Sequence, residues 1–222
     1  MSKLPIIRID IVSDVMCPWC IIGYKKLEQA MLNMKNNVEF QIYWQPFELN
    51  PEMPLAGEHL ATHLQDKYGS SKEQSIKSRQ QIVDIGKSVG FEFSFNENSR
   101  IYNSFLSHQL LHWAKLYDKQ TELKLALFDL YFTQQKNPSE LTLLLDVAEK
   151  VGLNREAAKE VLETQRYAQA VRDDQHFWHK NDVQAVPAFI FNKQYLLSGA
   201  QESQTLQDVI ETIIKEQREK LL

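Results

Sequence analysis

The sequence predicts an α/β fold that is divided in two by an all-helical insertion. Three observations predict it: β-branched runs near both ends of the chain, amphipathic stripes throughout the middle, and a proline-rich segment at the first passage between them. With 222 residues, the chain is long enough for one large domain or two small ones, at about 150 residues per domain.

The first part of the chain has a strand–helix–strand pattern. Residues 6–13 are mostly apolar and β-branched, which is typical of a buried strand. Pro18 suits the first turn of a helix, because an N–H group at that position has no hydrogen-bond partner within the helix. Apolar residues then recur at helical spacing as far as Met34. Apolar and polar residues alternate from Val38 to Trp44, which predicts a second strand.

A proline-rich segment ends this part. Pro46, Pro51 and Pro54 are followed by Gly57. Each proline restricts its own backbone and that of the preceding residue, so the segment is not helical. We therefore expect the first part of the α/β domain to span residues 1–57.

Helical signals fill residues 58–164. Ser70 with Glu73 suggests a capping box, and Asn154 suits the N-cap of a helix that begins at Arg155. Apolar stripes at helical spacing cover 102–117, 123–131 and 141–151. These stripes are too long and too regular for strands, so we predict a helical insertion domain over 58–164.

The pattern changes again over residues 165–222, the predicted second part of the α/β domain. The expected elements are a helix that ends near Asn181, a strand over 186–191, a turn over 192–194, a strand over 195–198 and a final amphipathic helix from Leu206. Without the insertion, the order of elements is that of a thioredoxin-like fold.

Composition excludes several classes of protein. The chain has 25 Lys and Arg against 29 Asp and Glu, a net charge of −4, which argues against nucleic acid and membrane surfaces as partners. No apolar run approaches the roughly 18 residues of a membrane span. Arg8 and Asp10 interrupt any signal-peptide core, so we expect a cytoplasmic protein.

The two cysteines, Cys17 and Cys20, flank Pro18 and Trp19 at the start of the first predicted helix. At the N-cap, a Cys17 thiolate meets unpaired N–H groups and the positive end of the helix dipole, so we expect its pKa to be lowered. Cys20 lies one turn further in, is more shielded and should keep the higher pKa. We therefore expect Cys17 to attack disulfides and Cys20 to resolve the mixed disulfide.

A zinc site is the alternative reading of this motif, and it needs a second pair of ligands. The available histidine pairs are His59/His63, His108/His112 and His176/His179. The cysteines open a long apolar helix after a buried strand, which is the context of a redox dithiol, so we expect no metal.

Val186 and Pro187 give a second signal at the start of a predicted strand. In a thioredoxin fold this position faces the dithiol and carries a cis peptide bond, which exposes the backbone of Val186 to an extended substrate chain. A trans proline at a strand edge is the alternative.

Several motifs recur in a definite order: residues 13–20 (SDVMCPWC), 46–51 (PFELNP) and 198–201 (SGAQ), with weaker matches at 67–69 and 103–108. Together they resemble DsbA-family dithiol oxidoreductases of the FrnE type, over essentially the whole chain. The resemblance implies thiol–disulfide exchange on protein or small-molecule disulfides, a cis Pro187, and Ser198, Gly199 and Gln201 near the dithiol. We expect no tightly bound cofactor; glutathione and thiol- or disulfide-bearing proteins are the expected partners.

A sister group has a similar layout, namely 2-hydroxychromene-2-carboxylate isomerases and kappa-class glutathione transferases. They usually have a serine at the position of Cys17, and that serine activates glutathione. The presence of both cysteines favours dithiol chemistry, and a glutathione-dependent isomerase or transferase is the alternative. Asn103 and His108 match a helix motif of both groups, and His108 is interpreted as a packing residue that faces the site.

Two carboxylates, Asp14 and Glu48, are further candidates to line the site. Either could take the Cys20 proton during resolution, or could simply cap and hydrogen-bond a loop. Trp19 could contact peptide substrates or shield the disulfide. A third hypothesis is a non-catalytic holdase with an apolar groove, although core packing explains the same aromatic residues: Tyr102, Phe105, Trp113, Phe128, Tyr131 and Phe132.

Overall fold

The computed structural model describes residues 4–219 and has the expected thioredoxin-like fold with a helical insertion. The main sheet has the strand order β2–β1–β5–β6. Strand β1 (Ile6–Ser13) runs parallel to β2 (Glu39–Pro46) and antiparallel to β5 (Ala188–Phe191). Strand β6 (Tyr195–Ser198) pairs antiparallel with β5 at the sheet edge.

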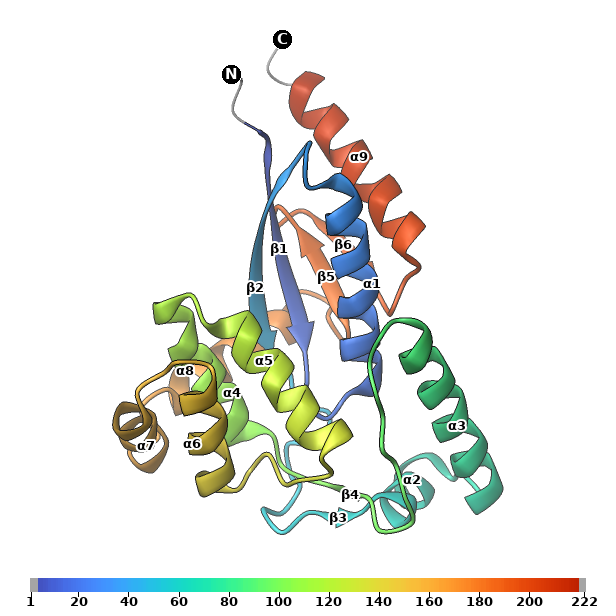
Figure 1. The fold of residues 1–222 in the computed structure, drawn as a ribbon, viewed down its shortest axis with the longest axis vertical. Helices are drawn as coiled ribbons and strands as arrows, with labels where there is room; N and C mark the ends of the chain where they lie inside the picture. Colours follow the sequence, from blue (N-terminus) through green and yellow to red (C-terminus); the bar gives the residue numbers. More distant parts are fainter. Residues whose placement is uncertain (1–3, 220–222) are drawn as a thin grey trace.

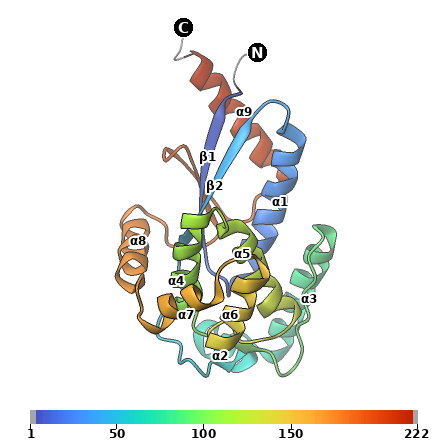
Figure 2. The ribbon, with the colours of Figure 1, turned by 60° about the vertical axis from the view of Figure 1, so that its left-hand side comes forward.

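Helices cover both faces of this sheet. Helix α1 (Pro18–Met34) and helix α9 (Ser203–Glu219) pack side by side on one face (Figure 1). Because side chains alternate along a strand, Ile9 of β1 joins the large core on the α1 side, whereas Val12 packs with Trp178 on the other. Trp178 belongs to α8 (Ala168–Lys180), which lies on the opposite side of the strands from α1 (Figure 2).

The insertion forms the broad lower part of the molecule in Figure 1. Its elements are β3 (Glu58–His59), α2 (Leu60–Tyr68), α3 (Lys72–Ser88), β4 (Arg100–Ile101), α4 (Phe105–Ala114), α5 (Gln120–Phe128), α6 (Leu141–Lys150) and α7 (Arg155–Glu163). A 3₁₀ turn (Lys115–Tyr117) follows α4, and a π-helical turn (Asp129–Thr133) extends α5.

Two details of the insertion differ from the sequence-based expectation. It is not entirely helical, because β3 and β4 pair as a short antiparallel ladder. Two-residue strands are too short to show an alternating pattern, so periodicity cannot reveal them. The capping box lies one residue later than expected, at Ser71 and Gln74 rather than at Ser70 and Glu73. Asn154 does cap the helix that begins at Arg155.

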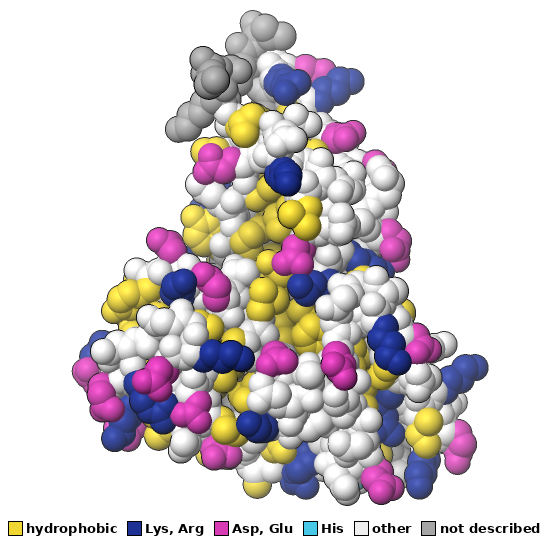
Figure 3. Space-filling view, viewed as in Figure 1, with side chains coloured by type: hydrophobic (Ala, Val, Ile, Leu, Met, Phe, Trp, Pro, Cys, Tyr) yellow, Lys and Arg dark blue, Asp and Glu magenta, His cyan; other side chains and the backbone are white. Residues whose placement is uncertain are grey.

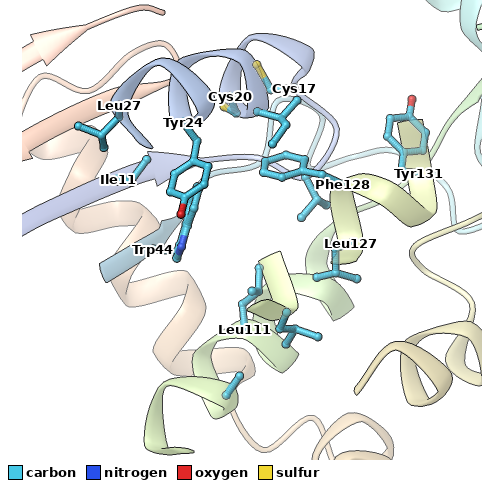
Figure 4. Packing of buried hydrophobic residues seen from close by; sticks show 14 of the residues in the cluster. Ile11, Cys17, Cys20, Tyr24, Leu27, Trp44, Leu111, Leu127, Phe128 and Tyr131 are labelled. Atoms are coloured by element: carbon cyan, nitrogen blue, oxygen red, sulfur yellow. The ribbon is translucent and has the colours of Figure 1, made fainter. Parts of the chain in front are cut away.

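The insertion shares its core with the sheet. One hydrophobic cluster contains Ile11 of β1, Leu27 of α1 and Trp44 of β2 together with Leu127 and Phe128 of α5 (Figure 4). The expected boundaries after residues 57 and 164 both fall between elements, and the division into domains stays a prediction. Among the helices of residues 4–219, none has the length and apolar character needed to span a membrane.

Candidate dithiol site

The two cysteines lie on the first turn of α1. Cys17 is the N-cap, with extended backbone angles, and Pro18 follows in the first turn. The N–H of Cys20 donates to the Cys17 carbonyl over 3.1 Å, so both side chains leave the same turn (Figure 4). Both are free thiols; Cys17 is 4% exposed and Cys20 is fully buried. Trp19 between them is 41% exposed.

The loop that precedes β5 lies against Cys17. The Val186–Pro187 peptide bond is cis, as expected, and the Cys17 thiol donates to the Val186 carbonyl at 3.6 Å. The N–H of Gly199 donates to the Pro187 carbonyl over 2.8 Å, which holds the turn of residues 198–201 against the same loop. Strand β5 itself begins only at Ala188, after the proline rather than at Val186.

Gly23 allows this loop to approach α1 closely. A Cβ atom at position 23 would lie 3.1 Å from Pro187 Cγ and 3.1 Å from Phe189 Cζ. Sequence reasoning did not single out Gly23. The available signal was a glycine inside an otherwise helical pattern, which often has a packing reason.

Asp14 and His108 come together beneath the surface. The Asp14 carboxylate accepts the N–H of Leu49 at 2.7 Å and that of Met16 at 3.1 Å. His108 Nε2 lies 3.6 Å from Asp14 Oδ1, too far for a direct hydrogen bond, and has no partner among the described residues. Burial by itself raises the pKa of Asp14, but nearby His108 and the two N–H donors lower it below its usual value.

Glu48 and Asn103 form hydrogen bonds that hold segments of the fold together. Glu48 accepts hydrogen bonds from Arg172 and, at 3.0 Å, from Gln175, both on α8. The Asn103 amide donates to the Met53 carbonyl at 3.1 Å. Glu48 thus attaches the proline-rich segment to α8, and Asn103 attaches it to the start of α4. These contacts agree with the loop-binding alternative for Glu48.

One charged residue of the site, Lys124 on α5, was not expected from the sequence. Its side chain is 1% exposed, and its Nζ donates to the Ser13 carbonyl at 3.3 Å. The signal in the sequence was its spacing, since Lys124 stands four residues before Phe128 and therefore lies on the apolar stripe of that helix. A lysine is seldom fully buried unless it has a charged partner.

The expected order of the two thiol pKa values is wrong. The hydrogen bond with Cys20, together with burial, raises the pKa of Cys17 well above its usual value. Burial alone also raises that of Cys20, but the hydrogen bond with Cys17, the charge of Lys124 and the Ser13 hydroxyl lower it. Only the helix N-terminus entered the expectation. The interaction between the two sulfurs comes first among the causes that lower the pKa of Cys20, and the full charge of buried Lys124 comes second.

The other hypotheses drawn from side-chain patterns find less support. Of the six insertion aromatics, Trp113, Phe128, Tyr131 and Phe132 are buried in the core rather than lining an open groove. Within residues 4–219, no three His, Cys, Asp or Glu side chains are grouped as a metal site. Figure 3 shows apolar side chains along the middle of one face, where the α/β part meets the helices below.

Known proteins of similar sequence and structure share this architecture. The uncharacterized protein YwbO of Bacillus subtilis is 28% identical over 215 residues, which are 96% of this chain and 98% of YwbO. The crystal structure of a probable DsbA oxidoreductase from Streptomyces coelicolor has a TM-score of 0.88 at 26% identity, covering 95% of this chain and 91% of that one. A 2-hydroxychromene-2-carboxylate isomerase has a TM-score of 0.68 at 14% identity, covering 96% and 98%, which shows a common fold.

The family model of the DsbA-like thioredoxin domain matches residues 8–211. Thiol–disulfide oxidoreductase or isomerase chemistry is the activity that this family and these neighbours support. The chain belongs to the family of DsbA-like thioredoxin domains.

Proposed function

We propose that this protein exchanges disulfides with thiol- or disulfide-bearing substrates, with Cys17 as the nucleophile and Cys20 as the resolving thiol. The observation that carries the proposal is the placement of the two sulfurs. Cys17 meets the Val186 carbonyl beside the exposed Trp19, whereas Cys20 is fully buried. A substrate disulfide therefore reaches Cys17 first.

The exchange runs in two displacements. The Cys17 thiolate attacks the substrate disulfide, a mixed disulfide forms, and one substrate thiolate leaves. Cys20 then attacks the Cys17 sulfur, and the second substrate thiolate leaves, so the substrate gains two electrons and the dithiol loses two. Before the first displacement, the proton of Cys17 passes to the neighbouring Cys20 sulfur, which places the negative charge on the outer sulfur.

The proposed substrates are cytoplasmic proteins or small disulfides, with glutathione as the redox partner. The cis-proline loop brings a backbone carbonyl, that of Val186, next to the reacting sulfur, where an extended chain could pair with it. Trp19 adds an apolar surface suited to peptide side chains. No tightly bound cofactor is required, because the cysteine pair itself carries both electrons.

Equilibration with glutathione redox buffers, followed by tryptophan fluorescence, tests this function. We expect one two-electron transition. Its reduction potential should be about −120 to −180 mV for an oxidant or isomerase and about −270 mV for a reductase. Trp19 reports it because it lies between the two cysteines in sequence. The absence of any transition would reject dithiol chemistry and favour the glutathione-dependent isomerase.

Two matched serine variants test the assignment of roles. Cys17→Ser should abolish exchange, whereas Cys20→Ser should accumulate a mixed disulfide, visible as a mass increase that a reductant removes. Turnover retained in Cys17→Ser would contradict the assignment.

A further inference from the structure

Lys124 is a cation with few partners in the interior of the molecule. Within residues 4–219, its only hydrogen bond is the one to the Ser13 carbonyl. The rest of its surroundings is aromatic, since Nζ lies 4.9 Å from the ring centre of Phe128 and 5.4 Å from that of Trp44. Burial therefore lowers the pKa of Lys124 to about 8, which makes its proton easy to exchange near neutral pH.

The anionic groups around Lys124 point to its partner in the reaction. The negative charge of Cys20 has the largest effect in keeping Lys124 protonated, ahead of Asp14 and Cys17. The Asp14 carboxylate is already engaged by two backbone N–H groups. Ser13, whose carbonyl accepts from Lys124, also brings a buried hydroxyl close enough to Cys20 to lower its pKa.

A small cavity leads from Lys124 toward the surface. Its volume is about 10 Å³, room for about one water molecule. Its lining includes the buried Lys124 and His108 and the exposed Lys115. His108 Nε2 has no hydrogen-bond partner in the described part of the chain, so it is available to a water molecule.

We propose that Lys124 takes the proton of Cys20 during the resolving step and releases it to solvent through this cavity. The inference rests on the proposed dithiol function. Once Cys17 is part of the mixed disulfide, no thiolate remains beside Lys124, and the buried lysine loses its proton and becomes a neutral amine. The proton of Cys20 then moves from its sulfur to the Lys124 nitrogen, giving a thiolate and an ammonium. The thiolate attacks the Cys17 sulfur, the enzyme disulfide forms, and the substrate leaves as a thiolate.

The oxidised site then contains an ammonium whose thiolate partner has become part of a disulfide. Lys124 consequently gives its proton to the cavity water and through it to solvent, where the released substrate thiolate takes up a proton. Charge and atoms balance without any further reactant. The titratable and charged groups around this route lie in the loop before α1, in α1, in α4, in the 3₁₀ turn after α4 and in α8. They are Asp14, Cys17, Cys20, His108, His112, Lys115 and Asp174.

A single-turnover reaction with the coloured aromatic disulfide dithiobis(nitrobenzoate) separates the two displacements. Attack by Cys17 releases one coloured thiolate, and resolution by Cys20 releases the second. In Lys124→Met we expect the first phase to be unchanged and the second to slow by about tenfold or more, the effect of a one-unit rise in the Cys20 pKa. The second phase should also require a more alkaline pH.

Two further variants make the test specific. Lys150→Met, at an exposed lysine at the end of α6, is the matched control and should leave both phases unchanged. Lys124→Arg keeps the charge but does not give up its proton. It should therefore remain slow in the second phase; a fast second phase in Lys124→Arg would show that charge alone suffices and would overturn proton transfer.

A measurement on the unaltered protein guards against misfolding of the variants. In heavy water the second phase should slow more than the first, because its proton moves during the resolving step, whereas the proton of Cys17 shifts to Cys20 before the first attack. Equal effects on both phases would overturn the inference. Release of a single thiolate would instead overturn the dithiol function itself, so the two failures are distinguishable.

Discussion

The two sulfurs of the dithiol, an outer one and an inner one, have different chemical surroundings. The outer sulfur, that of Cys17, faces main chain: the carbonyl of Val186, with Pro187 and Gly199 behind it. The inner sulfur, that of Cys20, faces side chains. Among them are the hydroxyl of Ser13 and the ammonium of Lys124, and the lysine belongs to the insertion.

Under the proposed function, this difference separates substrate recognition from thiol reactivity. Main-chain atoms are the same for every sequence, so the outer side suits extended substrates of many kinds. Charged side chains in a buried site have large effects on neighbouring thiols, so the inner side sets where the negative charge rests. Variants that alter one side at a time should therefore change different observables.

The largest expected effect comes from removing the charge of the inner side. Burial lowers the pKa of Lys124 from 10.5 to about 8, so between these values the unfolded chain binds more protons and native stability rises with pH. Lys124→Met should remove this rise and stabilise the protein near neutral pH by about 3 kcal/mol, while slowing resolution. Urea unfolding at neutral and alkaline pH measures it; an unchanged pH dependence would show that the lysine is not desolvated.

A smaller effect is expected on the outer side. Gly23→Ala places a Cβ 3.1 Å from Pro187 Cγ and from Phe189 Cζ. Overpacking should cost about 1–3 kcal/mol, partly offset by the better helix propensity of alanine. Because the loop must move away from α1, we expect the first thiolate release to change and the second to stay the same. The opposite pattern in the two-phase assay would contradict this division between the sides.

The smallest effect lies far from both sides, at the start of α3. The Ser71 hydroxyl accepts the N–H of Gln74 at 3.2 Å, so Ser71→Ala should cost about 1 kcal/mol of stability. Both phases of thiolate release should be unaffected. Ser70→Ala is the matched control, and its unfolding midpoint should not move. A larger loss of stability in Ser70→Ala than in Ser71→Ala would show that Ser70, as first expected, forms the capping box.

How much of the fold and of the site the sequence predicts depends on how far apart in the chain the contacting residues lie. The bounds of β1 and α1 and the position of Cys17 at the helix start follow from local signals. The cis bond before Pro187 could be expected only by combining Val186-Pro187 with the cysteine motif and the order of the strands. Lys124 was missed because its role depends on which face of α5 meets the sheet, and periodicity does not reveal that a lysine on an apolar stripe has a partner. The pKa order was wrong for the same reason.

The hydrophobic cluster that joins the insertion to the sheet has a consequence for unfolding (Figure 4). Trp44 of β2 and Phe128 of α5 belong to one continuous core, with ring centres 6.2 Å apart. Opening the insertion therefore exposes the core beneath α1, so we expect the two parts to unfold together. For a damaged copy of this protein, we then expect proteases to digest both parts, leaving no folded remnant that contains Cys17 and Cys20.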